Sequence, residues 1–497
     1  RRHTTAVDYA RRAGDRALAQ LAHDEAAMFY RQALDLLSAG AGIDQRRINL
    51  LISLGEAQRR AGDPRHRETL LEAARLADEA GDGAALARAA LANTRVLHYT
   101  AVGRVDADRI AVLERGLESI GDVATRTRLL ASLGLELLWE ADRRRRVRLS
   151  DEALATARGL GDRALLADVL LARFYTIASP ATLAERLSES GEVLAIADEL
   201  HDPMRKSRGL VLRVRAALEA GDSEEVDRCI RENEQLAKDL SLPAVQWVVT
   251  LHRAGRALLA GHIEQAEAVA PEIVELGEAA GQPDAWSQSV VLLLQVRFEQ
   301  GRMSEIEHDL ARVYHETGMR SLRAILAVLY CETGRDADAR SIFEDFFRGD
   351  YTIPEDMVWL RGTTELAAVC AHLHDTARAD ILYQRLLPYV DHFPTVLYGG
   401  LATGSVAHYV AVLATTQSRF DEAEHFFTKA SSLHDHIGAP TWQARTRLEW
   451  ARMLFNRGQP GGTERARVLL GQALASAREL GLAKVERDTV ALLQECG

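Results

Sequence analysis

The residues of this chain whose types could support chemistry lack the spacings that catalytic or metal sites require. No nucleophile elbow, no His-Glu-x-x-His stretch and no Cys-x-x-Cys pair occurs in the sequence. His372 with His374, and His434 with His436, are two residues apart, which places the rings of each pair on different sides of a helix and makes chelation poor. The sequence therefore predicts no enzyme activity, no cofactor and no metal site.

A glycine cluster has a faint likeness to a phosphate-binding loop. Gly399, Gly400 and Gly404 have a suggestive spacing, but no strand is expected before them, so the dinucleotide-binding context is missing. Close packing of helices explains these glycines better. Because no Gly-x-x-x-x-Gly-Lys-Ser/Thr loop occurs either, ATP binding is not assigned to these residues.

Length and composition indicate a soluble protein of several units. At 497 residues the chain exceeds the roughly 250 to 300 residues at which one core stops growing. The net charge of -11 argues against direct nucleic-acid binding, which needs a concentrated positive face. The four cysteines have no paired spacing, which is typical of reduced thiols in the cytoplasm, and apolar runs such as Val290 to Leu294 are too short to cross a membrane. Since the chain opens at Arg1 without a methionine, we expect further sequence upstream.

Turn-forming residues recur along the chain at intervals of about forty residues. The glycines on two such lattices are Gly81, Gly121, Gly161 and Gly281, and Gly221, Gly261 and Gly301. Apolar residues at three- and four-residue steps lie between the turns, as in a pair of antiparallel helices. In Gly-Asp steps such as Gly62-Asp63 and Gly221-Asp222, the glycine closes one helix in the left-handed conformation and the aspartate caps the next.

This period predicts an all-α, right-handed superhelical solenoid of about twelve helix pairs, each stacked only on its neighbours. Residues 1–348 form repeats 1–9, residues 349–400 a short repeat with longer flanking loops, and residues 401–497 repeats 11 and 12 with a capping helix from Ala483 to Cys496. The expected starts of the units are Thr4, Asp44, Ala84, Val123, Arg163, Pro203, Pro243, Pro283, Arg320, Asp356, Leu401 and Pro440.

Two segments resemble the second helix of a tetratricopeptide repeat. In Asp421-Glu422-Ala423 with Phe427 and Ala430, and in Glu25-Ala26 with Tyr30 and Ala33, small residues and an aromatic recur at interlocking positions. Most units depart from that family, because they lack its tryptophan-leucine-glycine pattern and are forty rather than thirty-four residues long.

A second resemblance covers nearly the whole chain. The segment from Asp15 to Leu37, with Leu149 to Leu154, Arg385 to Tyr389 and Ala444 to Glu449, is similar to the C-terminal repeat region of bacterial STAND-type signalling ATPases, including LuxR-type and cyclase-linked regulators. The resemblance implies an upstream nucleotide-switch (NTPase) domain that the repeats hold off until a ligand or partner binds. Neither that domain nor a DNA-binding helix-turn-helix occurs in these residues.

A run of arginines is the sharpest charge feature. Arg143, Arg144, Arg145 and Arg146 stand near an expected helix start, where the helix dipole disfavours cations. Two interpretations stay open: a solvated face balanced by nearby aspartates, or a docking site for an acidic partner or an upstream domain. The six tryptophans are expected mainly in the core.

The candidate ligand site follows from counting inward positions along the first helix of each pair. In the last units the set is Arg361, Thr364, His372, His408, Thr415, Arg445, Arg452 and Asn456. Arg208 and Arg215 extend this wall in a middle unit, and Tyr398 lies in a neighbouring loop that could close over a guest. A polar, basic wall predicts a small anionic effector or an acidic peptide, with solvated arginines as the alternative.

The sequence thus predicts a cytoplasmic sensor or scaffold that binds a protein, peptide or small anionic ligand and controls an attached ATPase regulator. A guest that bridges several units would change the curvature of the array. The alternative is a stand-alone adaptor for protein assembly.

Overall fold

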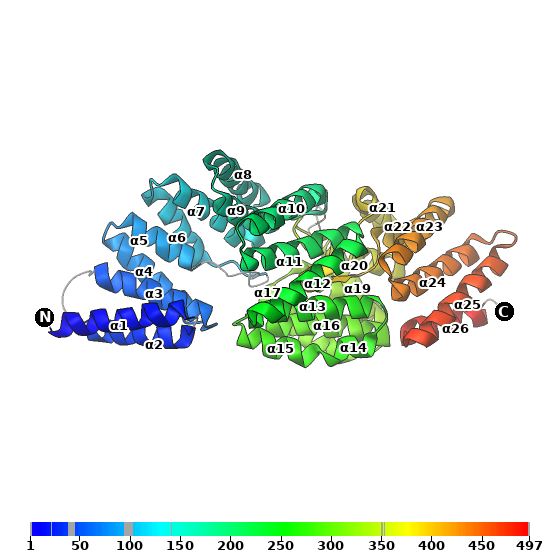
Figure 1. Cartoon of the computed structure of the whole chain (residues 1–497). Helices are drawn as coiled ribbons and strands as arrows, with labels where there is room; N and C mark the ends of the chain where they lie inside the picture. Colours follow the sequence, from blue (N-terminus) through cyan, green and yellow to red (C-terminus); the bar gives the residue numbers. More distant parts are fainter. Residues whose placement is uncertain are drawn as a thin grey trace. The chain divides into compact units, whose positions relative to one another are not determined.

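The computed structural model describes residues 2–20, 22–37, 45–93, 103–140, 142–348, 351 and 353–495. Over these residues the chain forms twenty-six α-helices, five short 3-10 turns and one hairpin of two-residue strands (Figure 1). The all-α prediction is confirmed. The predicted unit start at Asp44 and the predicted last cap residue, Cys496, lie outside the described residues. Among the helices of the described segments, none combines the length and apolar character that a bilayer crossing needs.

The chain divides into two compact units. Unit 1 comprises Arg1–Ile177, Ala195–Arg208 and Gly277–Asp284, and unit 2 comprises Ala178–Leu194, Gly209–Leu276 and Ala285–Gly497. The three-part division at residues 348 and 400 stays a prediction from repeat and loop lengths.

Unit 1 consists of consecutive antiparallel helix pairs. Its helices are α1 (Arg2–Ala19), α2 (His23–Leu36), α3 (Gln45–Arg60), α4 (His66–Glu79), α5 (Gly83–Ala92), α6 (Ala107–Ser119), α7 (Val123–Glu136), the turn η1 (Leu137–Trp139), α8 (Arg143–Leu160) and α9 (Arg163–Thr176). Small residues let the two helices of a pair approach closely: a Cβ at Gly14 would lie 2.7 Å from Cε1 of Tyr30, and a Cβ at Gly55 would lie 2.4 Å from Cγ of Leu70. The pairs are therefore tetratricopeptide-like, with an aromatic or leucine seated on a glycine.

The Gly-Asp steps form the helix boundaries that the sequence predicts. Gly81, Gly161 and Gly221 have φ of 68°, 70° and 79°, in the left-handed region. The following aspartates accept hydrogen bonds from the backbone N–H groups three residues on; for example, Asp82 caps α5 and accepts from the Ala85 N–H at 2.9 Å. Each such cap stabilises its helix by about 1 kcal/mol, so the period of the sequence becomes a period of helix ends.

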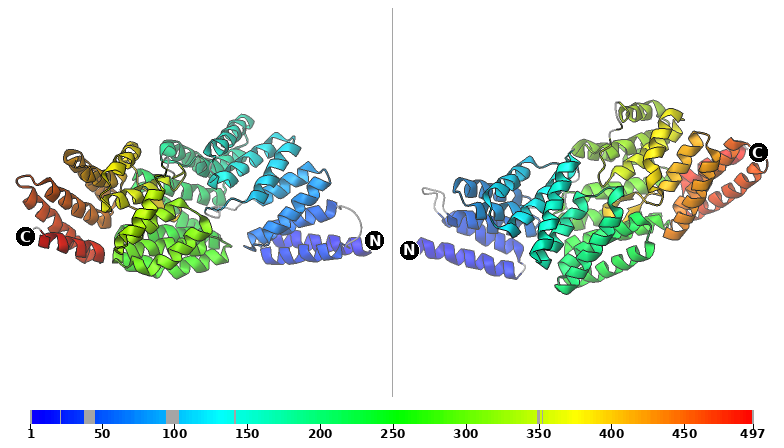
Figure 2. Two further views of the ribbon diagram at one scale, coloured as in Figure 1. Left: turned by 180° about the vertical axis from the view of Figure 1, so that it is seen from behind. Right: turned by 90° about the horizontal axis from the view of Figure 1, so that it is seen from above.

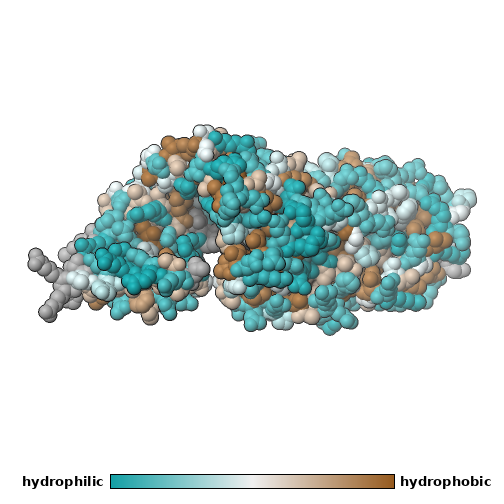
Figure 3. Space-filling view, viewed as in Figure 1, coloured by the Kyte–Doolittle hydropathy of each residue, from teal (hydrophilic) through white to brown (hydrophobic). Residues whose placement is uncertain are grey.

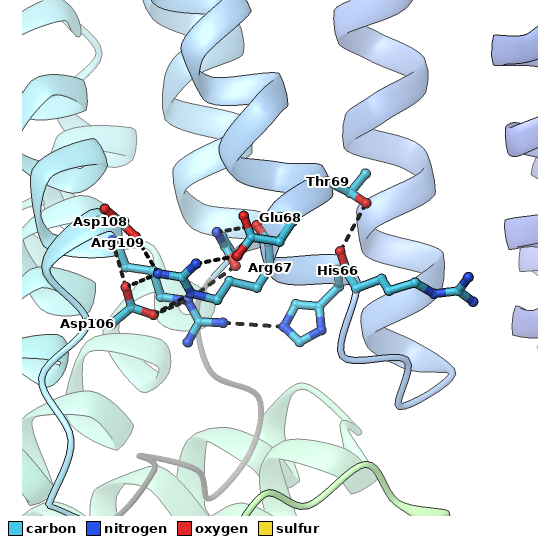
Figure 4. A network of polar contacts seen from close by, with 9 residues as sticks. His66, Arg67, Glu68, Thr69, Asp106, Asp108 and Arg109 are labelled. Carbon is cyan, nitrogen blue, oxygen red and sulfur yellow. Dashed lines mark hydrogen bonds and ion pairs between the residues drawn. The ribbon is translucent and has the colours of Figure 1, made fainter.

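Ion pairs join neighbouring pairs within unit 1 (Figure 4). Arg67, in the first turn of α4, donates to Asp106 at 2.7 Å and 2.8 Å and to Asp108 at 2.7 Å. Asp106 also caps α6, accepting from the Arg109 N–H at 3.2 Å. Burial alone would raise the pKa of Asp106, but the hydrogen bonds from Arg67 and Arg109 outweigh it and lower the pKa to about 2. This carboxylate therefore fastens the start of α4 to the start of α6.

Unit 2 contains the remaining elements. They are η2 (Pro180–Thr182), α12 (Ser223–Leu240), α13 (Pro243–Leu259), α14 (Ile263–Ala268), α16 (Ala285–Gln300), η3 (Met303–Ile306), α17 (Glu307–Thr317), α18 (Arg320–Glu332), α19 (Asp336–Asp345), α20 (Trp359–His372), α21 (Thr376–Leu386), η4 (Leu387–Tyr389), β1 (Thr395–Val396), η5 (Leu397–Gly399), β2 (Leu401–Ala402), α22 (Val406–Thr416), α23 (Phe420–Ile437), α24 (Pro440–Arg457), α25 (Gly462–Leu480) and α26 (Ala483–Glu495). α10 (Leu183–Glu199), α11 (Pro203–Ala220) and α15 (Ala270–Ala279) have residues in both units. Figure 2 shows α22 to α26, coloured from dark yellow through orange to red, lying side by side.

One feature of unit 2 differs from a simple solenoid. The segment 391–405, which contains the hairpin β1–β2, crosses α13, a helix that ends more than a hundred residues earlier in the chain. A Cβ at Gly255 of α13 would lie 2.2 Å from the carbonyl oxygen of Gly400, and a Cβ at Gly400 would lie 2.8 Å from Cα of His252. The expectation that each pair contacts only its neighbours is therefore wrong in unit 2. Gly399 and Gly400 are closely packed, but they lie in this crossing segment just after strand β1 and not between the helices of a repeat.

Candidate functional site

Unit 2 contains a cavity of about 920 Å³ that is lined almost entirely by first helices of successive pairs. The lining comes from α16, α18, α20, α22 and α24, from the capping helix α26, and from a few residues of the adjoining turns and second helices. On each helix the lining residues recur at steps of three and four, as in Arg361, Glu365, Ala368 and His372 of α20. Six helices therefore direct one stripe each at a common space.

Part of the wall is apolar and rich in aromatic rings. These residues include Phe298, Met303, Ile325, Val328, Tyr409, Val412, Phe427, Trp442, Leu448 and Val485. The rings of Tyr409 and Trp442 lie 5.9 Å apart, and a Cβ at Gly404 would lie 2.5 Å from Cε3 of Trp442, so the turn before α22 supports the indole. This wall suits an apolar or aromatic group of a guest.

The charged residues of the lining are balanced in sign. The cations are Arg361, Arg445, Arg452 and Lys484, and the carboxylates are Glu332, Asp336, Glu365, Glu449 and Asp488. Arg361 pairs with Glu365 at 2.7 Å, Arg452 pairs with Glu449 at 2.7 Å, and Lys484 pairs with Glu332 at 3.0 Å and with Asp488 at 2.7 Å. The wall that the sequence count expected to be basic therefore carries its own counterions.

Two ion pairs that involve lining arginines, Arg445–Glu299 and Arg361–Glu365, are buried. Arg445 of α24 pairs with Glu299 of α16 at 2.7 Å, and the two side chains are 9% and 5% exposed. The Arg445 guanidinium also lies 4.1 Å from the centre of the Phe298 ring. Burial raises the pKa of Glu365, the partner of Arg361, although that arginine opposes the shift. Because α16 and α24 are far apart in sequence, the first of these pairs closes the wall between them.

The C-terminal helix is fastened to the same wall. Lys484 of α26 reaches Glu332, the last residue of α18, and Asp488 on its own helix. Burial alone would lower the pKa of Lys484, but the two carboxylates outweigh it and raise that pKa. Lys484 therefore stays charged and holds α26 at the cavity.

A buried hydrogen-bonded histidine pair lies at the cavity beside Trp442. Nδ1 of His408 is 3.0 Å from Oγ1 of Thr446, which is 3.2 Å from Nδ1 of His434. Nε2 of His434 accepts from the backbone N–H of Ser405 at 2.8 Å. Burial lowers the pKa of His408 to about 3 and lowers that of His434 well below its ordinary value. Both rings are therefore neutral near pH 7.

The structure brings together seven of the residues that the sequence count selected. Those that line the cavity are Arg361, His372, His408, Thr415, Arg445, Arg452 and Asn456. At its edge, His372 lies 2.9 Å from Asp336 through Nε2 and Oδ1.

Four selected residues lie elsewhere. Thr364 is fully buried and its hydroxyl donates to carbonyls of its own helix, at 3.1 Å to Leu360 and 3.0 Å to Arg361. Tyr398 does not line the cavity, because its ring packs at 5.3 Å against the buried Trp247. Arg215 donates to the Met357 carbonyl at 2.8 Å in a separate, water-sized space, and Arg208 belongs to unit 1.

The arginine run 143–146 is engaged mostly within unit 1. Arg146 is 2% exposed and donates to the Thr176 carbonyl at 3.0 Å, so it is not available to a docking partner. Arg143 donates to the Ile177 carbonyl at 3.2 Å, and Arg145 pairs with Glu114. Arg144 is exposed. The docking prediction is corrected for Arg146, which is a packing residue because its guanidinium satisfies backbone carbonyls.

The outer surface offers a less specific candidate site than the cavity. The most exposed large hydrophobic residues are Tyr9 at 75%, Val468 at 54% and Met28 at 53%. On the face drawn in Figure 3, hydrophobic residues lie among hydrophilic ones, which is ordinary for a folded protein.

The described residues give no support to metal or thiol chemistry. No group of three or more His, Cys, Asp or Glu side chains that could hold a metal occurs in the described ranges. Cys229, Cys331 and Cys370 are buried, and burial raises the pKa of each thiol to about 12, which leaves them unreactive near pH 7. The arrangement of the site suits recognition.

Sequence reasoning missed the carboxylates and aromatics of the cavity. Glu365 and Glu449 lie four residues after Arg361 and Arg445, on the same helical stripes, so keeping acids in the count would have found them. Glu299 and Glu332 gave no such signal, because their partners are about 150 residues away in the sequence.

No family model and no curated protein matches this chain. Among solved structures, it is similar to a chain in the crystal structure of the APC/C hetero-tetramer Cut9-Hcn1, at 14% identity and a TM-score of 0.39, covering 97% of this chain and 96% of that one. It is also similar to the yeast Tom70 crystal structure, at 14% identity and a TM-score of 0.23, covering 99% and 96%. Both TM-scores are below 0.5.

Proposed function

We propose that this protein is an interaction scaffold whose unit 2 binds a peptide segment of a partner protein in the cavity. The observation that carries the proposal is the convergence of stripes from α16, α18, α20, α22, α24 and α26 on one space of about 920 Å³. Repeat proteins use such inner surfaces for binding. The volume lies within the roughly 300 to 1000 Å³ typical of ligand pockets.

The composition of the wall favours a peptide over a small anion. An anion would find each lining cation already paired with a carboxylate of the protein, whereas a peptide offers both apolar side chains for Trp442 and Phe427 and backbone groups for the polar residues. An acidic peptide would have to displace internal carboxylates first. We therefore place a peptide of low net charge in this cavity.

Selection from a library of random displayed peptides tests this function. Ala368 lines the cavity and is half-buried, so Ala368→Trp should fill part of the space and abolish enrichment of the peptides that wild type selects. Ala475 is exposed on α25 and does not line the cavity, so Ala475→Trp is the matched control and should select the wild-type peptides. Enrichment of the same peptides by the Ala368→Trp variant would disprove the proposal.

The sequence resemblance supports an extension of this function. In the intact gene product, the scaffold would act as the sensor of an attached nucleotide-switch ATPase, in transcriptional or cyclase signalling. Introducing Ala368→Trp into that product should change its stimulated ATPase or reporter output while Ala475→Trp does not. An output that is the same for both variants would leave an adaptor that assembles proteins without a switch.

A further inference from the structure

The hydrogen bonds around Thr446 fix where the protons of the two buried histidines lie. The Ser405 backbone N–H can only donate, so Nε2 of His434, 2.8 Å away, must be the unprotonated nitrogen. Since this ring is neutral, its proton is on Nδ1, from which it donates to the Thr446 hydroxyl oxygen.

The Thr446 hydroxyl then fixes the tautomer of His408. Its oxygen accepts from His434, and its own proton is directed to Nδ1 of His408 at 3.0 Å. Thr415 and Thr416 of α22 instead donate to carbonyls four residues earlier, at 2.9 Å and 3.0 Å, a bond that Thr446 does not make within the described part of the chain. Nδ1 of His408 is therefore an acceptor, and the neutral ring carries its proton on Nε2.

His408 lines the cavity, and its Nδ1 is engaged by Thr446. The remaining polar group of the ring, Nε2–H, can therefore serve a guest in the cavity. The ring meets the Trp442 indole at 5.7 Å between centroids and 76°, edge to face, and lies 5.2 Å from Tyr409 and 6.4 Å from Phe427. Arg445, whose charge acts on His408, is paired with Glu299. His408 therefore presents one oriented, uncharged N–H donor among aromatic rings.

We propose that the cavity recognises an uncharged carbonyl oxygen of a peptide, which lies beside Trp442 and accepts a hydrogen bond from Nε2–H of His408, with Thr446 and His434 as positioning residues. This assignment rests on the proposed function and specifies which group of the peptide is bound. A carbonyl is favoured over a carboxylate because His408 is neutral and the neighbouring arginine already has a carboxylate partner.

The first test needs no guest. Long-range proton–nitrogen NMR of the full chain, labelled at histidine, should show His408 protonated at Nε2 and His434 protonated at Nδ1, with assignments from His408→Gln and His434→Gln. Thr446→Ser keeps the hydroxyl and should preserve both tautomers, whereas the near-isosteric Thr446→Val removes the relay and should leave His408 in a mixture. A His408 ring protonated at Nδ1 in the wild type overturns the proposal.

The second test uses three probes that share a phenyl ring. 3-Phenylpropanamide, whose only acceptor is an uncharged carbonyl, should bind wild type and shift the His408 Nε2–H signal, while 3-phenylpropanoate, a carboxylate, and phenethylammonium, which has no acceptor, should bind more weakly. Thr446→Val should weaken the amide about fivefold to tenfold, the effect of one hydrogen bond, and Thr446→Ser should restore it. Tighter binding of the carboxylate, or no binding of the amide up to its solubility limit, overturns the proposal.

The two proposals fail separately. If Ala368→Trp abolishes peptide selection while Thr446→Val binds the amide as tightly as Thr446→Ser, the peptide scaffold stands and the His408 assignment falls. If Ala368→Trp selects the wild-type peptides, the scaffold function itself falls.

Discussion

Replacing Gly255 by alanine should destabilise unit 2 strongly, because there is no room for one methyl group between α13 and the segment 399–402. The added Cβ would lie 2.2 Å from the Gly400 carbonyl oxygen, 2.5 Å from its carbon and 2.9 Å from the Leu401 nitrogen. Normal contacts between heavy atoms are roughly 3.5 to 4.0 Å, so the backbone of the segment would have to move by about 1 Å.

That movement is opposed from the other side of the segment. A Cβ at Gly399 would already lie 2.6 Å from Cα of Arg215 on α11, so the segment is enclosed between two helices. Overpacking that shifts side chains and backbone typically costs about 1 to 3 kcal/mol, while alanine in a helix gains at most about 1 kcal/mol over glycine. Because this clash is with backbone on a segment held from both sides, we take the upper end of the range and expect a net loss of about 2 kcal/mol.

Gly471→Ala provides the control. Gly471 is also inside a helix, α25, but a Cβ there would meet nothing within 4 Å, so the substitution should stabilise by up to about 1 kcal/mol. Urea unfolding of both variants, followed by circular dichroism and by hydrogen exchange of α13 amides, gives the two shifts in midpoint. If Gly255→Ala is as stable as Gly471→Ala, the segment 399–402 does not lie against α13.

Two further predictions concern buried titratable groups in unit 2. Glu299→Gln should cost about 3 to 5 kcal/mol in urea unfolding, because it leaves Arg445 buried without its counterion, whereas Glu299→Gln with Arg445→Met should recover most of the loss; equal losses would refute a buried pair. The pKa of His252 is lowered by burial to about 4, that of His408 to about 3, and that of His434 well below 6.5, so the unfolded chain binds protons that the folded chain does not. The contribution of these histidines to the free energy of unfolding should be fully present above pH 6.5 and should fall toward pH 4 by about 1.4 kcal/mol per pH unit for each histidine. His252→Leu should remove about a third of the slope that these three residues cause. A slope unchanged by His252→Leu would contradict its neutral burial.

The helix pairs could be predicted from the sequence because the signals that set them are local. Gly-Asp turns and the prolines at helix starts act within a few residues, and α7, α9, α11, α13, α18 and α24 begin at the predicted residues. α22 begins at Val406 rather than near Leu401, because the intervening residues form strand β2 and cross α13. That crossing depends on residues far apart in the sequence, and no local pattern encodes it.

Sequence periodicity could predict those cavity residues that lie on one face of a helix. Arg445, Arg452 and Asn456 follow steps of seven and four on α24, and they do share a wall. The count failed at Thr364, which is buried on its own helix and does not line the cavity. The separate choice of Tyr398 failed because a loop residue has no periodicity from which to infer its direction. The count also gave the wall the wrong charge, since selecting basic residues by type left out Glu449 between them.

The cross-connections within unit 2 change how a guest could act on it. A solenoid in which each pair contacts only its neighbours can bend by small rotations at every interface, and the sequence predicted sensing by curvature on that basis. Here Glu299–Arg445 joins α16 to α24 and Glu332–Lys484 joins α18 to α26. Bending that separates these helices would have to break ion pairs, one of which is buried and costs several kcal/mol to lose.

The cavity is therefore better described as preformed than as flexible. A guest that fits it gains affinity because the side chains that it meets, such as His408 in its fixed tautomer, are already ordered by Thr446 and His434. A guest could signal by competing for Lys484 or Arg445, the cations of the two ion pairs that join distant helices. Lys484 is the more accessible of the two, at 22% exposed against 9% for Arg445. Displacing Lys484 from Glu332 would release α26, so a change in hydrogen exchange confined to α26 would distinguish this route from bending of the whole array.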